Sequence, residues 1–358
     1  MKERDASWDF VKTILMFFVV FGHICPAGEE WTPVTRVIGL FAIPLFFLVS
    51  GYFQSQISSA TALADKMKKT IKRIVVPMIA WGLVYVTLSA IKLFPMPDSF
   101  SLSAMTAGFH NLVGFLKYTP YYILGFYWFL TALLMCIVTG SLLSWIIAWR
   151  RSAGLLAVVL SVVLFCMFSP SIMEHYHFSF IWLFYAMGML FRHVGYQMCH
   201  YNSKKFVPIL FLLLLMVVVW LGASFSPEKT FYYTENTVNS VEATFIVKRY
   251  ALNVLASVVV LYWLLFAFRR NANNKYIVKL ANYGQDTLFV YCSHMLFIDF
   301  LYKPFLLPVL YHANVSVIIV ICEHFVGLLI SVMLYAFLQF LCSYMMKSRV
   351  YRKLLMGL

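Results

Sequence analysis

Charged side chains are scarce in this chain. Asp, Glu, Lys and Arg make up 12% of its 358 residues, against roughly 25% in soluble domains, while hydrophobic residues make up 62%. This composition excludes a soluble globular enzyme and a disordered tail. The seven cysteines show no CxxC spacing, and most of them lie in apolar runs. We therefore expect buried free thiols and no metal site, rather than a disulfide scaffold.

Acidic residues are scarcer than basic ones, 14 against 28, and the net charge is +14. In a soluble protein such an excess would indicate nucleic-acid binding. Here the basic residues lie between apolar runs, which is the pattern of membrane topology and predicts no nucleic-acid partner. The first apolar run lacks a small-residue cleavage site, so we expect it to be retained as a span.

Long apolar runs recur along the whole chain. A membrane-spanning helix needs about 20 predominantly apolar residues, and ten runs approach or exceed this length. We predict an all-α fold, a polytopic transmembrane helix bundle that forms a single domain over residues 1–358 with no appended soluble domain. The predicted spans cover residues 8–24, 37–53, 74–95, 122–148, 153–170, 178–192, 206–225, 247–268, 285–301 and 315–346.

The distribution of basic residues predicts the direction of these spans. Cytoplasmic segments of membrane proteins carry an excess of Lys and Arg. If both termini are cytoplasmic, most of the 28 basic residues lie on the inner side, and the exceptions are Arg36, Lys92, Lys117, Lys229, Lys248, Arg249 and Lys303. A missed or added span would disrupt this alternation, so we predict ten spans with cytoplasmic N- and C-termini.

Three polar residues lie in or beside the first span: Asp9, Lys12 and His23. Eleven positions at about 100° each return His23 to nearly the helix face of Lys12, about 16 Å farther along the axis. Lys12 is equally consistent with an interface lysine whose amine reaches the headgroups. Taken alone, His23 fits a hydrogen-bonded histidine at the outer interface better than a catalytic one.

Two further features lie near the cytoplasmic face. Ser50 and Gly51 are small enough for close helix packing, or for a ligand at the mouth of the bundle. Lys69, Lys72 and Arg73 are three and four residues apart, so a helix places them on one face. Such a cluster can bind a nucleotide or pantetheine phosphate through charge-assisted hydrogen bonds. The alternative ligands are anionic membrane lipids.

The remaining candidates lie in later spans. Trp128 begins the fourth span, where an aromatic belt is also expected. His294 follows Tyr291 in the ninth run and falls near the middle of the membrane. Glu323 lies in the tenth run and could orient one of the histidines, or could make a structural hydrogen bond across helices.

Together these residues resemble the acyltransferase-3 family of membrane acyltransferases, in particular its fucose 4-O-acetylase-like group. The family has a basic residue, ten residues and a histidine in its first helix, often with Asp three residues before the basic one. Two departures concern Thr70, where the family often has the first residue of Arg-x-x-Arg, and Thr287, which replaces a serine. The matching segments are Asp9 with Lys12, and residues 19–23, 44–52, 128–130 and 283–294.

The resemblance implies a ten-helix enzyme of the bacterial cytoplasmic (inner) membrane. It implies O-acyl transfer from cytoplasmic acyl-CoA, usually acetyl-CoA, to a sugar hydroxyl of an envelope or lipid-linked glycan. A separate extracytoplasmic protein is a possible partner, because no soluble domain is expected on the chain. The competing interpretations are a polysaccharide exporter or proton-coupled transporter, and a structural subunit of an envelope assembly.

The resemblance also implies roles for the candidate residues. His23 is the favoured general base, and His294 orients groups or stabilises the oxyanion, although the reverse assignment and a transient acyl-histidine remain open. Asp9 joins the catalytic set as part of the first-helix signature. The donor phosphates are assigned to Lys12, Ser50, Lys69, Lys72 and Arg73, and contacts to the substrate or to the catalytic residues are assigned to Trp128, Tyr291 and Glu323.

Overall fold

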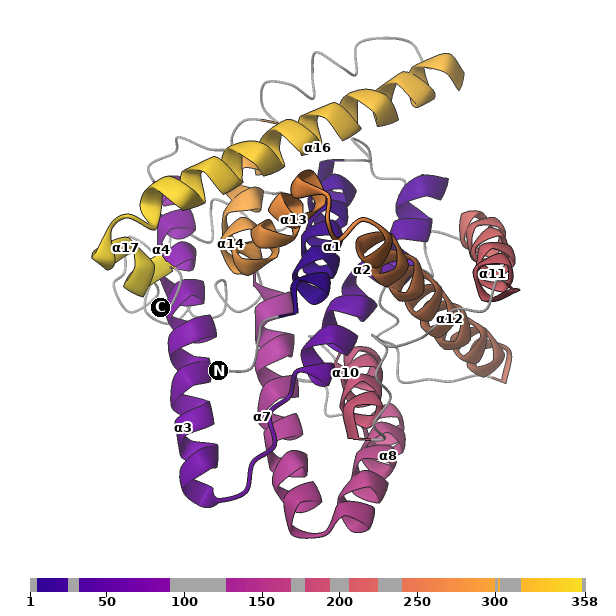
Figure 1. Cartoon of the computed structure of the whole chain (residues 1–358), viewed down its shortest axis with the longest axis vertical. Helices are drawn as coiled ribbons and strands as arrows, with labels where there is room; N and C mark the ends of the chain where they lie inside the picture. Colours follow the sequence, from indigo (N-terminus) through magenta and orange to yellow (C-terminus); the bar gives the residue numbers. More distant parts are fainter. Residues whose placement is uncertain are drawn as a thin grey trace. The chain divides into compact units, whose positions relative to one another are not determined.

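A computed structural model describes residues 5–24, 32–90, 127–168, 178–193, 206–224, 240–299, 302 and 317–355. Every regular element within these ranges is helical (Figure 1). The helices are α1 (Ala6–Ile24), α2 (Pro33–Tyr52), α3 (Ala60–Thr70), η1 (Ile71–Val75), α4 (Val76–Ala90), α7 (Trp128–Trp149), α8 (Arg151–Phe168), α10 (Phe178–His193), α11 (Phe206–Ala223), α12 (Ser240–Arg270), α13 (Lys275–Asn282), η3 (Tyr283–Gln285), α14 (Thr287–Phe297), α16 (Val317–Met345) and α17 (Arg349–Leu355).

The all-α membrane fold predicted from the sequence is confirmed. Each of the ten predicted spans contains at least part of a described helix. Within the described ranges, five helical segments are long and apolar enough to cross a membrane: 6–24, 33–52, 128–149, 247–270 and 324–345. Other apolar helices are shorter, including α10 with 16 residues and α14 with 11. The chain is an integral membrane protein, and the number of spans and the side of the termini stay predictions.

Local hydrogen bonds explain where several helices begin. The carboxylate of Asp5 accepts from the backbone N–H of Ser7 at 2.9 Å at the start of α1. The hydroxyl oxygen of Thr32 accepts from the N–H of Thr35 at 3.3 Å, ahead of a proline at the first position of α2. Asn274 caps α13 in the same way. These side chains satisfy amide groups that have no partner within a helix.

The chain divides into two compact units, and each is described by itself. Unit 1 comprises residues 1–63 and 135–287, and unit 2 comprises residues 64–134 and 288–358. Unit 1 therefore holds α1, α2, α8, α10, α11, α12, α13 and η3, with most of α7. Unit 2 holds η1, α4, α16 and α17, with most of α3, the beginning of α7 and nearly all of α14. The single acyltransferase-type domain stays a prediction.

Within unit 1, α2 and α10 approach each other through glycines. A methyl group on Gly51 would lie 2.0 Å from the carbonyl oxygen of Tyr185, and one on Gly188 would lie 2.0 Å from the carbonyl oxygen of Leu48. At the crossing, the backbone of each helix therefore contacts the backbone of the other, with no side chain between them. Small residues serve this purpose at helix contacts in membranes, so the structure supports the packing interpretation of Gly51.

The direction of α1 relative to α2 follows from their aromatic contacts. Trp8, near the beginning of α1, stacks on Tyr52 at the end of α2 with ring centroids 4.6 Å apart. Farther along both helices, Phe18 packs against Phe41 at 5.4 Å. The two helices are therefore antiparallel neighbours, as the alternation of basic segments predicts for consecutive spans.

Candidate active site

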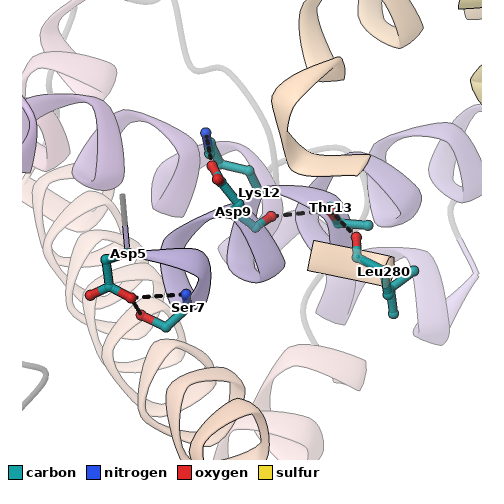
Figure 2. A network of polar contacts seen from close by, with 6 residues as sticks. All are labelled: Asp5, Ser7, Asp9, Lys12, Thr13 and Leu280. Carbon is teal, nitrogen blue, oxygen red and sulfur yellow. Dashed lines mark hydrogen bonds and ion pairs between the residues drawn. The ribbon is translucent and has the colours of Figure 1, made fainter. Parts of the chain in front are cut away.

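Asp9 and Lys12 form an ion pair on the first turns of α1. The Nζ atom of Lys12 lies 2.6 Å from Oδ1 of Asp9, and the two residues are three positions apart on one helix (Figure 2). The Asp9 side chain is buried, whereas that of Lys12 keeps 27% of its surface exposed. The pair therefore holds the lysine ammonium group in one direction while leaving part of it accessible.

The segment around this ion pair is packed tightly against the chain that precedes α14. The Thr13 hydroxyl lies 3.0 Å from the carbonyl oxygen of Asp9 and 2.9 Å from that of Leu280, and it donates to these two acceptors (Figure 2). A methyl group on Gly284 would lie 2.0 Å from the Asp9 carbonyl oxygen. Gly284, noted in the sequence as part of a motif, is therefore required by the close approach of α1 and η3.

His23 lies in the last turn of α1 and is exposed. The continuous helix from Ala6 to Ile24 confirms that Lys12 and His23 share one helix. Asp9 and His23 are 14 positions apart, which corresponds to about 21 Å along the helix axis. Asp9 therefore contacts Lys12 and is too far along α1 to orient the His23 ring directly.

Ser50 lies in the last turn of α2 and is half-buried. Its hydroxyl donates to the carbonyl oxygen of Phe46 at 2.8 Å, so its proton is used within the helix. The segment that follows α2 is fixed by Gln54, which the sequence did not single out. The Gln54 amide accepts from the Tyr185 hydroxyl at 2.8 Å and donates to Ser141 at 3.0 Å.

His294 lies in α14, in unit 2, and is 1% exposed. Its Nδ1 atom lies 2.6 Å from the carbonyl oxygen of Tyr291 and 3.2 Å from that of Val290. A carbonyl oxygen can only accept a hydrogen bond, so Nδ1 carries a proton. In the neutral ring the lone pair is then on Nε2, and this nitrogen is buried.

Aromatic side chains surround the turn that precedes His294. The Tyr291 ring packs against Phe129 at 4.9 Å and against Tyr127 at 6.3 Å between centroids. The Tyr127 hydroxyl donates to the carbonyl oxygen of Cys292 at 3.2 Å. The half-buried Trp128 lies between these two residues in the chain, and its ring packs edge to face on Phe129. The start of α7 thus supports the backbone of α14 next to His294.

The basic cluster lies where α3 continues into α4. Lys69 lies in the last turn of α3, whereas Lys72 and Arg73 belong to η1, a π-helical turn of five residues. All three side chains are exposed. The expected spacing on one face assumed an uninterrupted α-helix, and a π-turn with its i→i+5 hydrogen bonds alters that spacing. Such turns occur frequently at functional sites.

Several predicted residues have a limited description. Glu323 is in α16, but its side chain lies outside those described.

Cys136 and Cys292 are buried free thiols, and Cys342 is buried as well. Among the described side chains, no group of three or more His, Cys, Asp and Glu residues is arranged to hold a metal ion.

Unit 2 also holds a buried hydrogen-bonded pair that the sequence motifs did not indicate, Tyr85 and Asp299. The signal that could have identified Asp299 is a carboxylate inside the ninth apolar run. Tyr85 carries no comparable signal, because tyrosine is frequent in this chain, with 22 residues.

Comparison with known proteins adds a family assignment to this geometry. Residues 5–346 match a family model described as an acyltransferase domain. Nodulation protein NolL of Mesorhizobium japonicum is 25% identical over 233 residues, 61% of this chain and 56% of that protein. Nodulation protein NolL of Sinorhizobium fredii is 30% identical over 138 residues, 37% of this chain and 34% of that protein.

The aligned part of the chain thus spans about half the length of the first of these relatives and a third of the second. No solved structure matches the chain. The family model nevertheless covers nearly all of the sequence, including every candidate residue predicted from it. The chain belongs to the acyltransferase-3 family.

Proposed function

We propose that this protein is an O-acyltransferase that moves an acyl group, in the simplest case acetyl, from cytoplasmic acyl-CoA to a glycan hydroxyl. The acceptor is an envelope or lipid-linked saccharide, and the membrane is the bacterial cytoplasmic (inner) membrane. The observation that carries this proposal is the family match over residues 5–346. In the reaction the hydroxyl oxygen bonds to the thioester carbonyl carbon, the C–S bond breaks, and CoA leaves as the thiol after taking up a proton.

The donor phosphates are proposed to bind the basic side chains at the cytoplasmic face. Lys69, Lys72 and Arg73 are exposed and cationic, which suits a solvated phosphate ligand. Lys12 is oriented by the Asp9 carboxylate at 2.6 Å. We therefore assign Asp9 a positioning role toward Lys12. The oxygen of Ser50 is proposed to contact the donor as an acceptor, because its proton is used within α2.

The proposed chemistry uses both histidines. We retain His23 as the general base that removes the proton from the acceptor hydroxyl, a contribution of about 10²–10⁴-fold in rate. A neutral His294 with a proton on Nδ1 can only accept at Nε2. This tautomer supports two roles for His294: orienting a substrate hydroxyl by accepting its hydrogen bond, or removing that proton in place of His23. Stabilising an oxyanion would require the protonated ring. Trp128 and Tyr291 are proposed to contact the acceptor sugar, and Glu323 to support the site.

Acetyl-CoA labelled in its acetyl group tests the proposal on purified protein in proteoliposomes. Free CoA and labelled product are followed with and without an envelope-glycan extract. We expect extract-dependent release by the wild type and a loss of about 10²–10⁴-fold in kcat for whichever of His23→Ala and His294→Ala removes the base. If a histidine only orients the acceptor, its replacement by alanine should instead raise the KM for the acceptor.

The matched control is Ser331→Ala, because the buried Ser331 hydroxyl donates to the carbonyl oxygen of Gly327 within α16. This variant should keep wild-type turnover. Full activity of both histidine variants would contradict the proposed chemistry. An absence of donor binding and of CoA release in the presence of the extract would contradict the enzyme and favour an exporter, which a glycan-flux assay then tests. Restored release on addition of an extracytoplasmic protein fraction would identify a partner.

A further inference from the structure

Unit 2 holds a buried polar pair that the proposed reaction does not use. The Tyr85 hydroxyl on α4 donates to Oδ2 of Asp299 at 3.0 Å. Tyr85 is 8% exposed and Asp299 is 4% exposed. Asp299 follows α14 in a short π-helical segment at residues 298–299. A carboxylate inside an apolar span is costly and is a functional candidate by default.

The same two helical segments meet at a second contact. Trp81 lies one turn before Tyr85 on α4, and its ring packs edge to face on Phe289 with centroids 5.4 Å apart. Phe289 lies five residues before His294, and Asp299 lies five residues after it. The contacts with α4 therefore bracket the histidine along the chain, one on each side.

The two contacts constrain the histidine-bearing segment to different degrees. A ring–ring contact tolerates a range of offsets and angles. A hydrogen bond to a carboxylate weakens steeply when its distance or angle departs from the optimum. The Tyr85–Asp299 bond is therefore the contact that best resists sliding or rotation of this segment along α4. A shift of one residue along a helix turns every side chain by about 100°.

We propose that Tyr85 and Asp299 are a positioning pair that holds His294 at one depth and one rotation in unit 2. The backbone bonds of Nδ1 set the tautomer of the ring. The Tyr85–Asp299 bond sets where the lone pair of Nε2 is directed, because it anchors the segment that carries the ring. This inference rests on the proposed role of His294 in the reaction.

A second explanation for the same pair is electrostatic. A carboxylate near a histidine stabilises the protonated imidazole. Substitution separates the two explanations, because Asp299→Asn keeps an oxygen that accepts from Tyr85 but removes the charge. Asp299→Leu removes both, and Tyr85→Phe removes only the donor. If position is what matters, asparagine rescues the function that leucine loses.

The test measures kcat and the KM for acetyl-CoA in the CoA-release assay. The KM for the acceptor is measured as well. If His294 removes the proton, we expect kcat to fall about tenfold to a hundredfold in Tyr85→Phe and in Asp299→Leu, since small misplacements of a reacting group can cost about 10²-fold. If His294 orients the acceptor hydroxyl, the KM for the acceptor should rise in these variants instead. The KM for acetyl-CoA should be unchanged, and the double variant should be no worse than either single one. Asp299→Asn should keep most of the activity. The matched control is Ser293→Ala, whose buried hydroxyl donates to Phe289 within the helix.

A spectroscopic readout keeps this inference separate from the proposed function. The ring nitrogens of ¹⁵N-labelled histidine report tautomer and environment, and His294→Ala identifies the His294 signals among the nine histidines. Tyr85→Phe should shift or broaden these signals, and Asp299→Asn and Ser293→Ala should leave them in place. This holds even if the wild type releases no CoA.

Three results would overturn the positioning pair. Unchanged kcat, an unchanged KM for the acceptor and unchanged His294 signals in Tyr85→Phe would show that the hydrogen bond has no such role. Equal losses in Asp299→Asn and Asp299→Leu would assign the effect to charge. If the loss of activity in the double variant equals the product of the losses in the two single variants, the two side chains act independently.

Discussion

The Asp9 side chain illustrates how one residue serves both the fold and the site. Its backbone carbonyl accepts from Thr13 and closely approaches Gly284, while its carboxylate pairs with Lys12. The sequence motif presented Asp9 as a catalytic candidate beside the histidine. The geometry associates it with the lysine instead, and this difference leads to a measurable expectation.

Asp9→Asn should weaken acetyl-CoA binding and destabilise the protein. The ammonium group of Lys12 loses its oriented partner, and a hydrogen bond to a charged group contributes about 1.5–3 kcal/mol. We expect a lower melting temperature in detergent and roughly tenfold weaker acetyl-CoA binding by calorimetry, if Lys12 supplies one charge-assisted contact. The double variant Asp9→Asn/Lys12→Gln should recover part of the stability but not the binding. Recovery of binding in the double variant would argue against a role for Lys12.

At the scale of elements, glycines determine how closely the helices of unit 1 pack. Gly51 and Gly188 bring α2 and α10 into backbone contact, and Gly284 does the same for η3 and α1. Hydrophobic side chains would supply apolar area at these crossings but would hold the backbones farther apart. The positions of Lys12 and of the residues after α2 therefore depend on these three glycines, whose lack of a side chain permits the close approach.

Gly51→Ala, Gly188→Ala and Gly284→Ala should each destabilise the protein by about 1–3 kcal/mol, the usual cost of overpacking. In each case the new methyl group meets backbone atoms rather than the end of a flexible side chain. Thermal unfolding in detergent measures the effect. Gly22→Ala is the control, since a methyl group there meets nothing within 4 Å and alanine favours a helix. A Gly22 variant as unstable as the others would contradict the packing argument.

For the whole molecule, the basic segments carry the information about orientation. The segments predicted to lie on the inner side contain most of the 28 basic residues, and the antiparallel packing of α1 on α2 agrees with alternation of the first two spans. The family assignment agrees with a membrane acyltransferase. The side of each terminus is open to direct measurement.

Both termini should be cytoplasmic. A fluorescent protein fused after Leu358 should fluoresce, and an alkaline phosphatase fusion at the same point should be inactive. An alkaline phosphatase fused within the predicted outer loop at residues 226–246 should instead be active. This fusion serves as the internal control. An active phosphatase at the C-terminus would indicate an odd number of spans.

The sequence by itself determined the fold class, the family and most of the candidate residues. Apolar runs of membrane-spanning length leave helices as the structure that satisfies the backbone inside lipid, and spacing along a single helix placed Lys12 relative to His23. The spacing of residues along one helix does not predict hydrogen-bond partners that come from distant segments of the chain. The π-turn at Lys72 and Arg73 also altered a spacing that had been derived from α-helical geometry.

Only the tertiary structure decided which partners these residues have. It brought the Thr13 hydroxyl to the carbonyl oxygen of Leu280, and it brought Tyr85 to Asp299 across 214 positions of sequence. The physical reason is that a buried polar group must find a hydrogen-bond partner wherever the packing places one. Helical periodicity predicts which face a residue occupies, whereas close packing selects the atom that it meets there.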